Sequence, residues 1–335
     1  MSVRRLRAIT AAAIATTTLV AACGGGSGSG GDGKVTLALV AYSTPQAAFT
    51  DIIAAFQKTP EGKSITFTQS YGASGDQSRA VAAGLKADIV EFSLETDITR
   101  LVKAGLVAED WNSGPTKGIL TKSIVVVGTR KGNPKNLRTW DDLIKPGVEV
   151  ITPNPFTSGA ARWNLLAGYG AKSDKDANQE AGLAYLDSLL HNVPVQDDSG
   201  RKALQTFTGG KGDALLTYEN EAIFAQQNKQ ELEYVVPDAT LLIENPVAVT
   251  KNSAHPKEAA AFLKYLYSVE AQTIFAKNGY RPVIDGVTGF TWPDPPRLFT
   301  IEDIGGWDKI TSDFFDPKTG RVAEIERKLG VATEK

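Results

Sequence analysis

Strand-like and helix-like segments alternate along most of the chain, and this alternation limits the possible folds more than any other feature. Residues 35–41 are apolar and rich in strand-forming side chains, and a helix is expected over 44–57, with Pro45 near its start. Residues 64–69 alternate polar and apolar, as a half-buried strand does, and the next helix is expected over 76–85. Strands that alternate with helices in this way predict an α/β fold.

Two long extended stretches divide the chain. The first covers 123–129 and the second covers 241–249, and both have the apolar character of strands. Such a pair of crossings predicts one domain inserted into another, with two lobes joined by hinge strands around a cleft. We therefore expect a first lobe made of 34–122 and 248–335, and a second lobe made of 123–247.

The N-terminal residues have the pattern of an export signal. Arg4, Arg5 and Arg7 form a basic start, and the apolar residues 8–20 follow them. This apolar stretch is shorter than the roughly 20 residues that span a bilayer, so it fits the hydrophobic region of a secretory signal. The consecutive Arg4 and Arg5 leave a twin-arginine export route open beside the general secretory route.

Cys23 ends this signal and is expected to carry a lipid. Residues 19–23 resemble the lipobox of bacterial lipoproteins, in which small residues precede a cysteine that accepts the lipid. Residues 24–33 are almost all Gly and Ser, which predicts a flexible tether. We therefore expect 1–23 to be a lipoprotein signal peptide, and the exported chain to be anchored on the outer face of the cytoplasmic membrane. The alternative is an ordinary signal peptide with an incidental cysteine.

The residue counts argue against several classes of function. Cys23 is the sole cysteine, so no disulfide can form within the monomer, and the 2 histidines offer little for a zinc site. A net charge of −2 argues against nucleic-acid binding, and also against capture of an anion by bulk positive charge. We expect a monomer with no metal, no cofactor and no nucleic-acid partner.

An enzyme is the less favoured alternative. A hydrolase for sulfate or phosphate esters would need an activated nucleophile or a metal cluster. Residues 72–75 do not form a nucleophile elbow, because Asp76 stands where that motif requires glycine. Residues 205–212 do not form a phosphate-binding loop, because no Ser or Thr follows Lys211. We therefore expect no catalytic residue.

Small residues stand at three places where a strand ends and a helix begins, namely 71–75, 155–160 and 198–200. The first turn of a helix carries unpartnered N–H groups and a partial positive charge, and Gly and Ser let an anion approach them closely. Ligands of open α/β sheets bind beyond the carboxyl ends of the strands. Several helix starts that meet there could hold a dianion without Lys or Arg, although each one alone could be an ordinary helix cap.

Residues 150–164 closely resemble a signature of the bacterial sulfate-binding proteins. Further segments that resemble this family follow the same order along the chain: 74–81, 130–134, 140–148, 219–222, 264–268 and 277–282. The resemblance covers nearly the whole mature chain. It implies a two-lobed periplasmic-binding-protein fold of type II, which captures sulfate or thiosulfate in the cleft and delivers it to the membrane permease of an ABC importer.

The resemblance also implies a ligand set made of neutral donors. Ser158 would offer both its N–H and its hydroxyl, and the other implied ligands would offer backbone N–H groups. These others are Ser74, Gly159, Ala160 and Gly200.

Three positions depart from the family pattern. Tyr218 stands where the family has a Trp that donates its indole N–H, and a phenol differs in reach and can also accept a hydrogen bond. Ser43, after the first strand, replaces a usual Asp, and Asp76 replaces a common Lys. We include Ser43 and Tyr218 in the expected sulfate site, and the departures bear on its fine selectivity.

A site built only from donors favours sulfate over phosphate. Sulfate only accepts hydrogen bonds, whereas hydrogen phosphate keeps a proton that needs an acceptor, and an unpaired buried polar group costs about 1–3 kcal/mol. Asp76, Asp197 and Asp198 could supply such an acceptor, but carboxylates are also common at helix starts for electrostatic reasons. Thiosulfate, molybdate and phosphate remain alternative ligands. An envelope interaction protein that keeps the fold without transport is an alternative function.

Overall fold

The structure is a computed structural model that describes residues 34–334 of the 335-residue chain. The predicted signal peptide at 1–23, the lipidated Cys23 and the tether at 24–33 lie outside these described residues. Across residues 34–334, no helix combines the length and the apolar character that a bilayer crossing needs.

The described residues form an α/β arrangement, which confirms the predicted alternation. The strands are β1 (Val35–Tyr42), β2 (Ile65–Gly72), β3 (Ile89–Glu91), β4 (Ile119–Arg130), β5 (Val150–Ile151), β6 (Ala214–Tyr218), β7 (Leu232–Val235), β8 (Ala239–Val249) and β9 (Arg297–Phe299). The helices are α1 (Gln46–Phe56), α2 (Ser74–Ala82), α3 (Glu95–Lys103), α4 (Gly159–Lys172), α5 (Gln179–His191), α6 (Gly200–Thr208), α7 (Glu219–Gln227), α8 (Pro256–Leu266), α9 (Val269–Lys277), α10 (Gly306–Phe315) and α11 (Arg321–Lys328), with 3₁₀ turns η1 (Trp140–Ile144) and η2 (Glu302–Ile304). Neighbouring strands pair in the order β2-β1-β3-β8-β4-β6-β5, while β7 pairs with β4 and β9 with β8.

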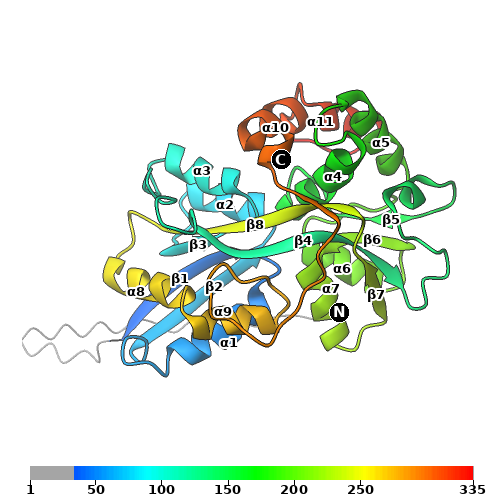
Figure 1. The fold of residues 1–335 in the computed structure, drawn as a ribbon. Coiled ribbons are helices and arrows are strands. Elements are labelled where there is room, and N and C mark those ends of the chain that lie inside the picture. The colour runs from blue at the N-terminus through cyan, green and yellow to red at the C-terminus, as the bar shows by residue number, and fades with distance from the viewer. Residues whose placement is uncertain (1–33, 335) are drawn as a thin grey trace, which may run out of the picture. The chain divides into compact units, whose positions relative to one another are not determined.

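The first half of the sheet is covered on both faces. β1 pairs in parallel with β2 and β3. Leu37, Leu39 and Ala41 pack with α1, α8 and α9, while Val40 packs with α2 and α3 on the opposite face. Figure 1 shows α2 and α3 above these strands and α1, α8 and α9 below them. Strands buried on both faces explain the almost continuous apolar run of β1.

The second half repeats this arrangement with its own helices. β6 and β7 pair antiparallel with β4, and β5 pairs in parallel with β6. Val125 and Val127 pack on the side of α4 and α5, whereas Ile124 and Val126 pack with α6 and α7. Each half therefore buries apolar side chains on both sides of its strands.

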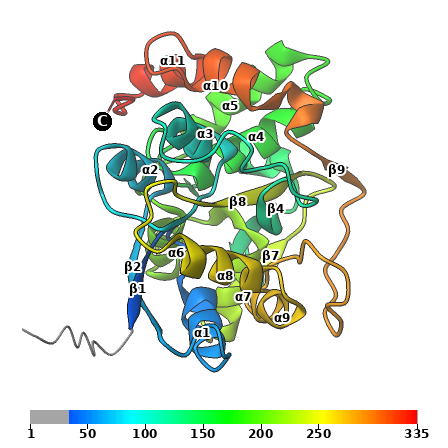
Figure 2. The same cartoon turned by 90° about the vertical axis from the view of Figure 1, so that its left-hand side faces the viewer.

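β4 and β8 are long strands that belong to both halves. β4 pairs with β8 through residues 119–124 and with β6 through 125–129. β8 pairs with β4 through 242–246 and with β3 through 247–249. Both predicted extended stretches fall within these two strands, which Figures 1 and 2 show running through the middle of the molecule.

The C-terminal residues divide between the two halves. α8 and α9 contact β1 and α1, in the first half. β9 pairs with β8, and α11 contacts α5 in the second half, where Phe314, Phe315 and Ile325 join the apolar core of α4 and α5. This packing differs from the expectation that all of 248–335 returns to the first lobe. The lobe boundaries themselves stay a prediction.

A buried ion pair ties the loop after α9 to the start of α7. Arg281 Nε donates to Glu219 Oε2 at 2.8 Å, and the Glu219 side chain is fully buried. Burial raises the pKa of Glu219, and the Arg281 guanidinium acts in the opposite direction. The Arg281 backbone also exchanges hydrogen bonds with Lys122 of β4, at 2.8 and 3.0 Å. Arg281 thus joins β4, α7 and the loop after α9.

We predict that Arg281→Met lowers the free energy of unfolding by about 3–5 kcal/mol, because it leaves the Glu219 charge buried without a partner. The control is Lys131→Met, which removes an exposed pair with Glu231 at 3.1 Å and should cost less than about 1 kcal/mol. Urea unfolding monitored by circular dichroism measures both. Equal losses in the two variants would contradict the bracing role of Arg281.

Candidate functional site

The first turn of α2 lies against the first turn of α4. The Gly75 N–H donates to the Thr157 carbonyl at 3.1 Å. A Cβ atom on Gly159 would lie 2.5 Å from the Ser93 hydroxyl oxygen, so α4 needs glycine where it passes the loop after β3. The structure therefore brings the predicted residues around 74 and 158–160 together, although they are far apart in sequence.

The first turn of α6 joins this cluster. A Cβ atom on Gly200 would lie 3.2 Å from the Ala160 Cβ and 3.7 Å from the Thr44 Cγ2. The Arg201 guanidinium donates to the Thr44 carbonyl at 2.9 Å. Three helix starts and the turn after β1 thus meet beyond the ends of the central strands, as the motifs predict.

Backbone N–H groups in these first turns are available to a ligand. Four predicted residues have N–H groups without a hydrogen bond among residues 34–334: Ser74, Gly159, Ala160 and Gly200. Ser158 differs, because its N–H donates to the Asn154 carbonyl at 2.9 Å. The Ser158 hydroxyl makes no helix-capping bond. The hydroxyl, rather than the N–H, is therefore the available donor of Ser158.

The Ser74 hydroxyl has a different role from its N–H. It donates to Asp97 Oδ2 at 2.6 Å and accepts the Ser93 N–H at 2.9 Å. Asp97 is buried and also accepts from Arg100 at 2.8 Å. The hydroxyl proton of Ser74 is thus committed to Asp97, which positions the start of α2. The sequence contains no local signal for this role of Asp97, since an acid in the first turn of α3 is common for electrostatic reasons.

Tyr218 is buried at the start of α7 and reaches across to the first half. Its hydroxyl oxygen lies 2.6 Å from the Ser93 hydroxyl oxygen, and its ring centroid lies 6.5 Å from that of Tyr42. Burial raises the pKa of the Tyr218 phenol far above its usual value, so the side chain stays neutral. Ser93, which no sequence motif indicates, is therefore central to the cluster.

Ser43 lies at the end of β1 and is partly buried. The Tyr42 hydroxyl before it donates to Asn245 Oδ1 at 3.0 Å, and the amide of Asn245 donates to the Ser93 carbonyl at 3.1 Å. Asn245 thus links the Tyr42 side chain to the backbone of Ser93. A ligand contact from Ser43 itself stays a prediction.

The carboxylates near the helix starts mostly have cationic partners. Asp76 pairs with Arg79, and Asp198 pairs with Lys202. Asp197 differs, because its Oδ2 atom is buried without a hydrogen-bond partner among the described residues. Of the three carboxylates that could weaken a donor-only site, Asp197 is the one whose charge no ion pair balances among the described residues.

The partly buried cation beside the cluster, Arg201, is also neutralised. Arg201 forms a two-point ion pair with Glu221, with both distances at 2.8 Å, and the Glu221 side chain is almost fully buried. The Arg201 guanidinium also lies over the Phe224 ring, 3.9 Å from its centroid. The positive charge of Arg201 is therefore balanced by Glu221, and the donors that remain at the helix starts are neutral.

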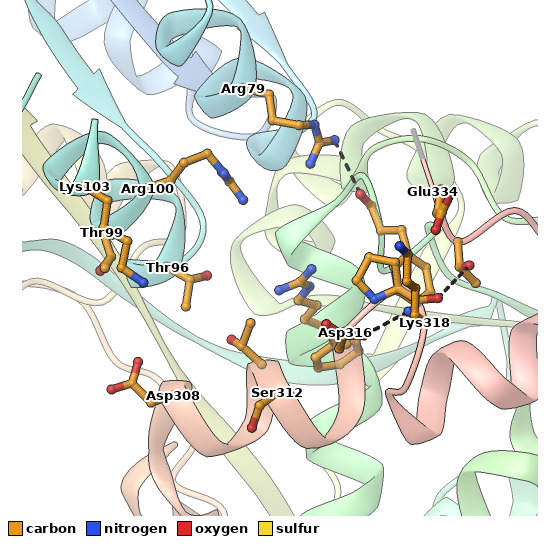
Figure 3. Close-up of a pocket in the computed structure, with 16 residues that line it drawn as sticks. Arg79, Thr96, Thr99, Arg100, Lys103, Asp308, Ser312, Asp316, Lys318 and Glu334 are labelled. Carbon is orange, nitrogen blue, oxygen red and sulfur yellow. Dashed lines mark hydrogen bonds between the residues drawn. The ribbon is translucent and has the colours of Figure 1, made fainter. Parts of the chain in front are cut away.

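A cavity of about 960 Å³ opens beside this cluster (Figure 3). Arg79, Arg100 and Arg162 line it from α2, α3 and α4, and Asp308 and Asp316 line the opposite wall. None of the seven predicted ligand residues lines this cavity.

Arg162, in this cavity wall, has a structural role. Its Nε donates to the Pro155 carbonyl at 2.9 Å, and its guanidinium lies 4.7 Å from the centroid of the Phe315 ring. Burial lowers the pKa of Arg162 to about 10, so it remains charged at neutral pH. Arg162 holds the loop before α4 and packs against α10.

The chain matches bacterial binding proteins over most of its length. The family described as bacterial extracellular solute-binding protein matches residues 37–281. A sulfate-binding protein of Synechococcus elongatus is 42% identical over 321 residues, which are 92% of each chain. A thiosulfate-binding protein of Pseudomonas aeruginosa is 37% identical over 291 residues, which are 82% of this chain and 88% of that protein.

A solved structure matches as well. The sulfate-binding protein SubI from Mycobacterium tuberculosis has 46% sequence identity and a TM-score of 0.82, over 84% of this chain and 100% of that chain. The fold is therefore the two-lobed type II periplasmic-binding-protein fold that the resemblance implies. Such proteins bind solutes and are not enzymes. This chain belongs to the sulfate-binding protein family of bacterial extracellular solute-binding proteins.

Proposed function

We propose that this protein captures sulfate where the first turns of α2, α4 and α6 meet, and delivers it to an ABC importer. The observation that carries the proposal is a buried cluster of neutral donors. Ser74, Gly159, Ala160 and Gly200 offer N–H groups, and Ser158 offers a hydroxyl. The sulfate-binding relatives support the identity of the ligand.

Neutral donors are sufficient to hold a dianion. Each helix start contributes a partial positive charge as well as N–H groups that no carbonyl satisfies. Hydrogen bonds to a charged group contribute about 1.5–3 kcal/mol each. Several of them together offset the cost of removing sulfate from water, with no ammonium or guanidinium in the set.

Thiosulfate is the second candidate ligand. It has the same charge as sulfate and the same tetrahedral shape, and a thiosulfate-binding relative covers most of the chain. Sulfur accepts hydrogen bonds more weakly than oxygen does, so a cluster that donates on every side favours sulfate.

Calorimetric titration with sulfate, thiosulfate, molybdate and phosphate tests the proposal. We expect sulfate to bind most tightly and phosphate to bind roughly 5- to 150-fold more weakly, because its proton lacks an acceptor in a donor-only site. Phosphate binding as tight as sulfate binding would overturn the assignment. Absence of binding by all four anions would refute anion capture.

We predict that Ser158→Ala weakens sulfate binding roughly 10- to 150-fold while leaving the thermal midpoint nearly unchanged. The hydroxyl makes no cap bond in the free protein, so its removal costs the fold little. The control is Ser113→Ala at an exposed position, which should change neither quantity. A loss of stability with less than a threefold change in affinity would make Ser158 a structural cap.

We further propose that the protein is exported and anchored through a lipid on Cys23, which keeps the captured anion close to the permease. Two or more acyl chains give stable attachment, whereas one chain is marginal. Mass spectrometry of the N-terminal peptide from host membranes should find a diacylglycerol on Cys23. Cys23→Ala should move the protein out of the membrane fraction, and Ser27→Ala should not. An unmodified Cys23 would refute the anchor without affecting the sulfate proposal.

A further inference from the structure

Ser93 connects the two halves of the molecule at the proposed site. It follows β3 and is buried, with 1% of its surface exposed. Its N–H donates to the Ser74 hydroxyl in the first half, and its carbonyl accepts from the Trp163 indole of α4 at 2.9 Å. The backbone of Ser93 is thus fully engaged, which fixes the direction of its side chain.

The Ser93 hydroxyl lies between two of the predicted ligand residues. Its oxygen is 2.6 Å from the Tyr218 hydroxyl oxygen, and a Cβ atom on Gly159 would lie 2.5 Å from it. The hydroxyl is therefore next to the first turn of α4, where the free N–H groups of Gly159 and Ala160 are found.

A count of protons shows that this hydroxyl pair has a spare donor. Tyr218 and Ser93 carry two hydroxyl protons between them, and the bond that joins them uses one. Within residues 34–334, the Ser93 hydroxyl has no further hydrogen-bond partner, and the Asn245 side chain is the other polar group near the Tyr218 phenol. Asn245 Oδ1, a nearby acceptor, already receives the Tyr42 hydroxyl and the Thr121 hydroxyl, at 3.0 and 3.3 Å.

We propose that Ser93 is a further ligand of the bound anion, and that its hydroxyl donates to the anion while Tyr218 donates to Ser93. A phenol is more acidic than an alcohol, so Tyr218 is the better donor within the pair, and its bond makes the Ser93 hydroxyl a stronger donor in turn. The inference rests on the proposed sulfate site and assigns Tyr218 a supporting place in it. Because the pair joins the two halves, the same bond also holds them together at the site.

The test compares sulfate affinity in Ser93→Ala, Tyr218→Phe and the double variant by calorimetry. Ser93→Ala should weaken binding roughly 10- to 100-fold, since it removes a hydrogen bond to a charged group. Tyr218→Phe should weaken binding by about 3- to 10-fold, since it removes only support for that bond. The double variant should bind like Ser93→Ala, because Tyr218 acts through Ser93.

Matched controls separate binding from folding. Tyr185→Phe removes another buried phenol bond, to the Trp140 carbonyl at 3.0 Å, and should lower the thermal midpoint without changing sulfate affinity. If Ser93→Ala folds poorly, Ser93→Cys takes its place. It keeps a side chain of similar size with only a weak donor, so it should lose about as much sulfate affinity as is expected of Ser93→Ala.

The outcomes distinguish this inference from the proposed function. A larger loss for Tyr218→Phe than for Ser93→Ala would make the tyrosine the ligand and overturn the inference. If sulfate affinity changes less than twofold in both Ser93→Ala and Tyr218→Phe while the unmodified protein binds sulfate tightly, the pair is purely structural. That result would overturn the inference and leave the sulfate proposal standing. Absence of sulfate binding by the unmodified protein would overturn both.

Discussion

The candidate site is built on buried backbone N–H groups that have no hydrogen-bond partner among residues 34–334. The first turns of α2, α4 and α6 present such groups, and Ser74, Gly159 and Gly200 are all buried there. An unsatisfied buried donor costs about 1–3 kcal/mol, so several of them together are unfavourable until acceptors satisfy them. In the proposed site, a dianion with oxygens in every direction would supply those acceptors together.

Many contacts between the two halves near the candidate site are polar, such as the Gly75 N–H to Thr157 and the Ser93 hydroxyl to Tyr218. The Arg281–Glu219 ion pair joins the halves as well. The large apolar clusters lie mostly within one half, with α1, α8 and α9 in the first half and α6 and α7 in the second. The long strands β4 and β8, which pair with strands of both halves, join them through the backbone.

The sequence predicted the strands and the donor motifs well, and it placed helix starts less well. The helix expected over 76–85 begins at Ser74 as α2. Start signals rely on side-chain caps, and Ala73 before α2 has no side-chain acceptor to make one. Ser93 could not be found locally, since its partner Tyr218 is 125 residues away.

Selectivity among oxyanions follows from how the carboxylates and hydroxyls of the site are already used. The Ser74 proton is held by Asp97, and the charges of Asp76 and Asp198 are balanced by Arg79 and Lys202. A carboxylate that is paired in this way neither accepts a ligand proton nor repels a dianion strongly. These paired carboxylates therefore favour a fully ionised ligand over a protonated one. Asp197, whose Oδ2 is buried without a partner among the described residues, is the carboxylate to which this argument does not apply.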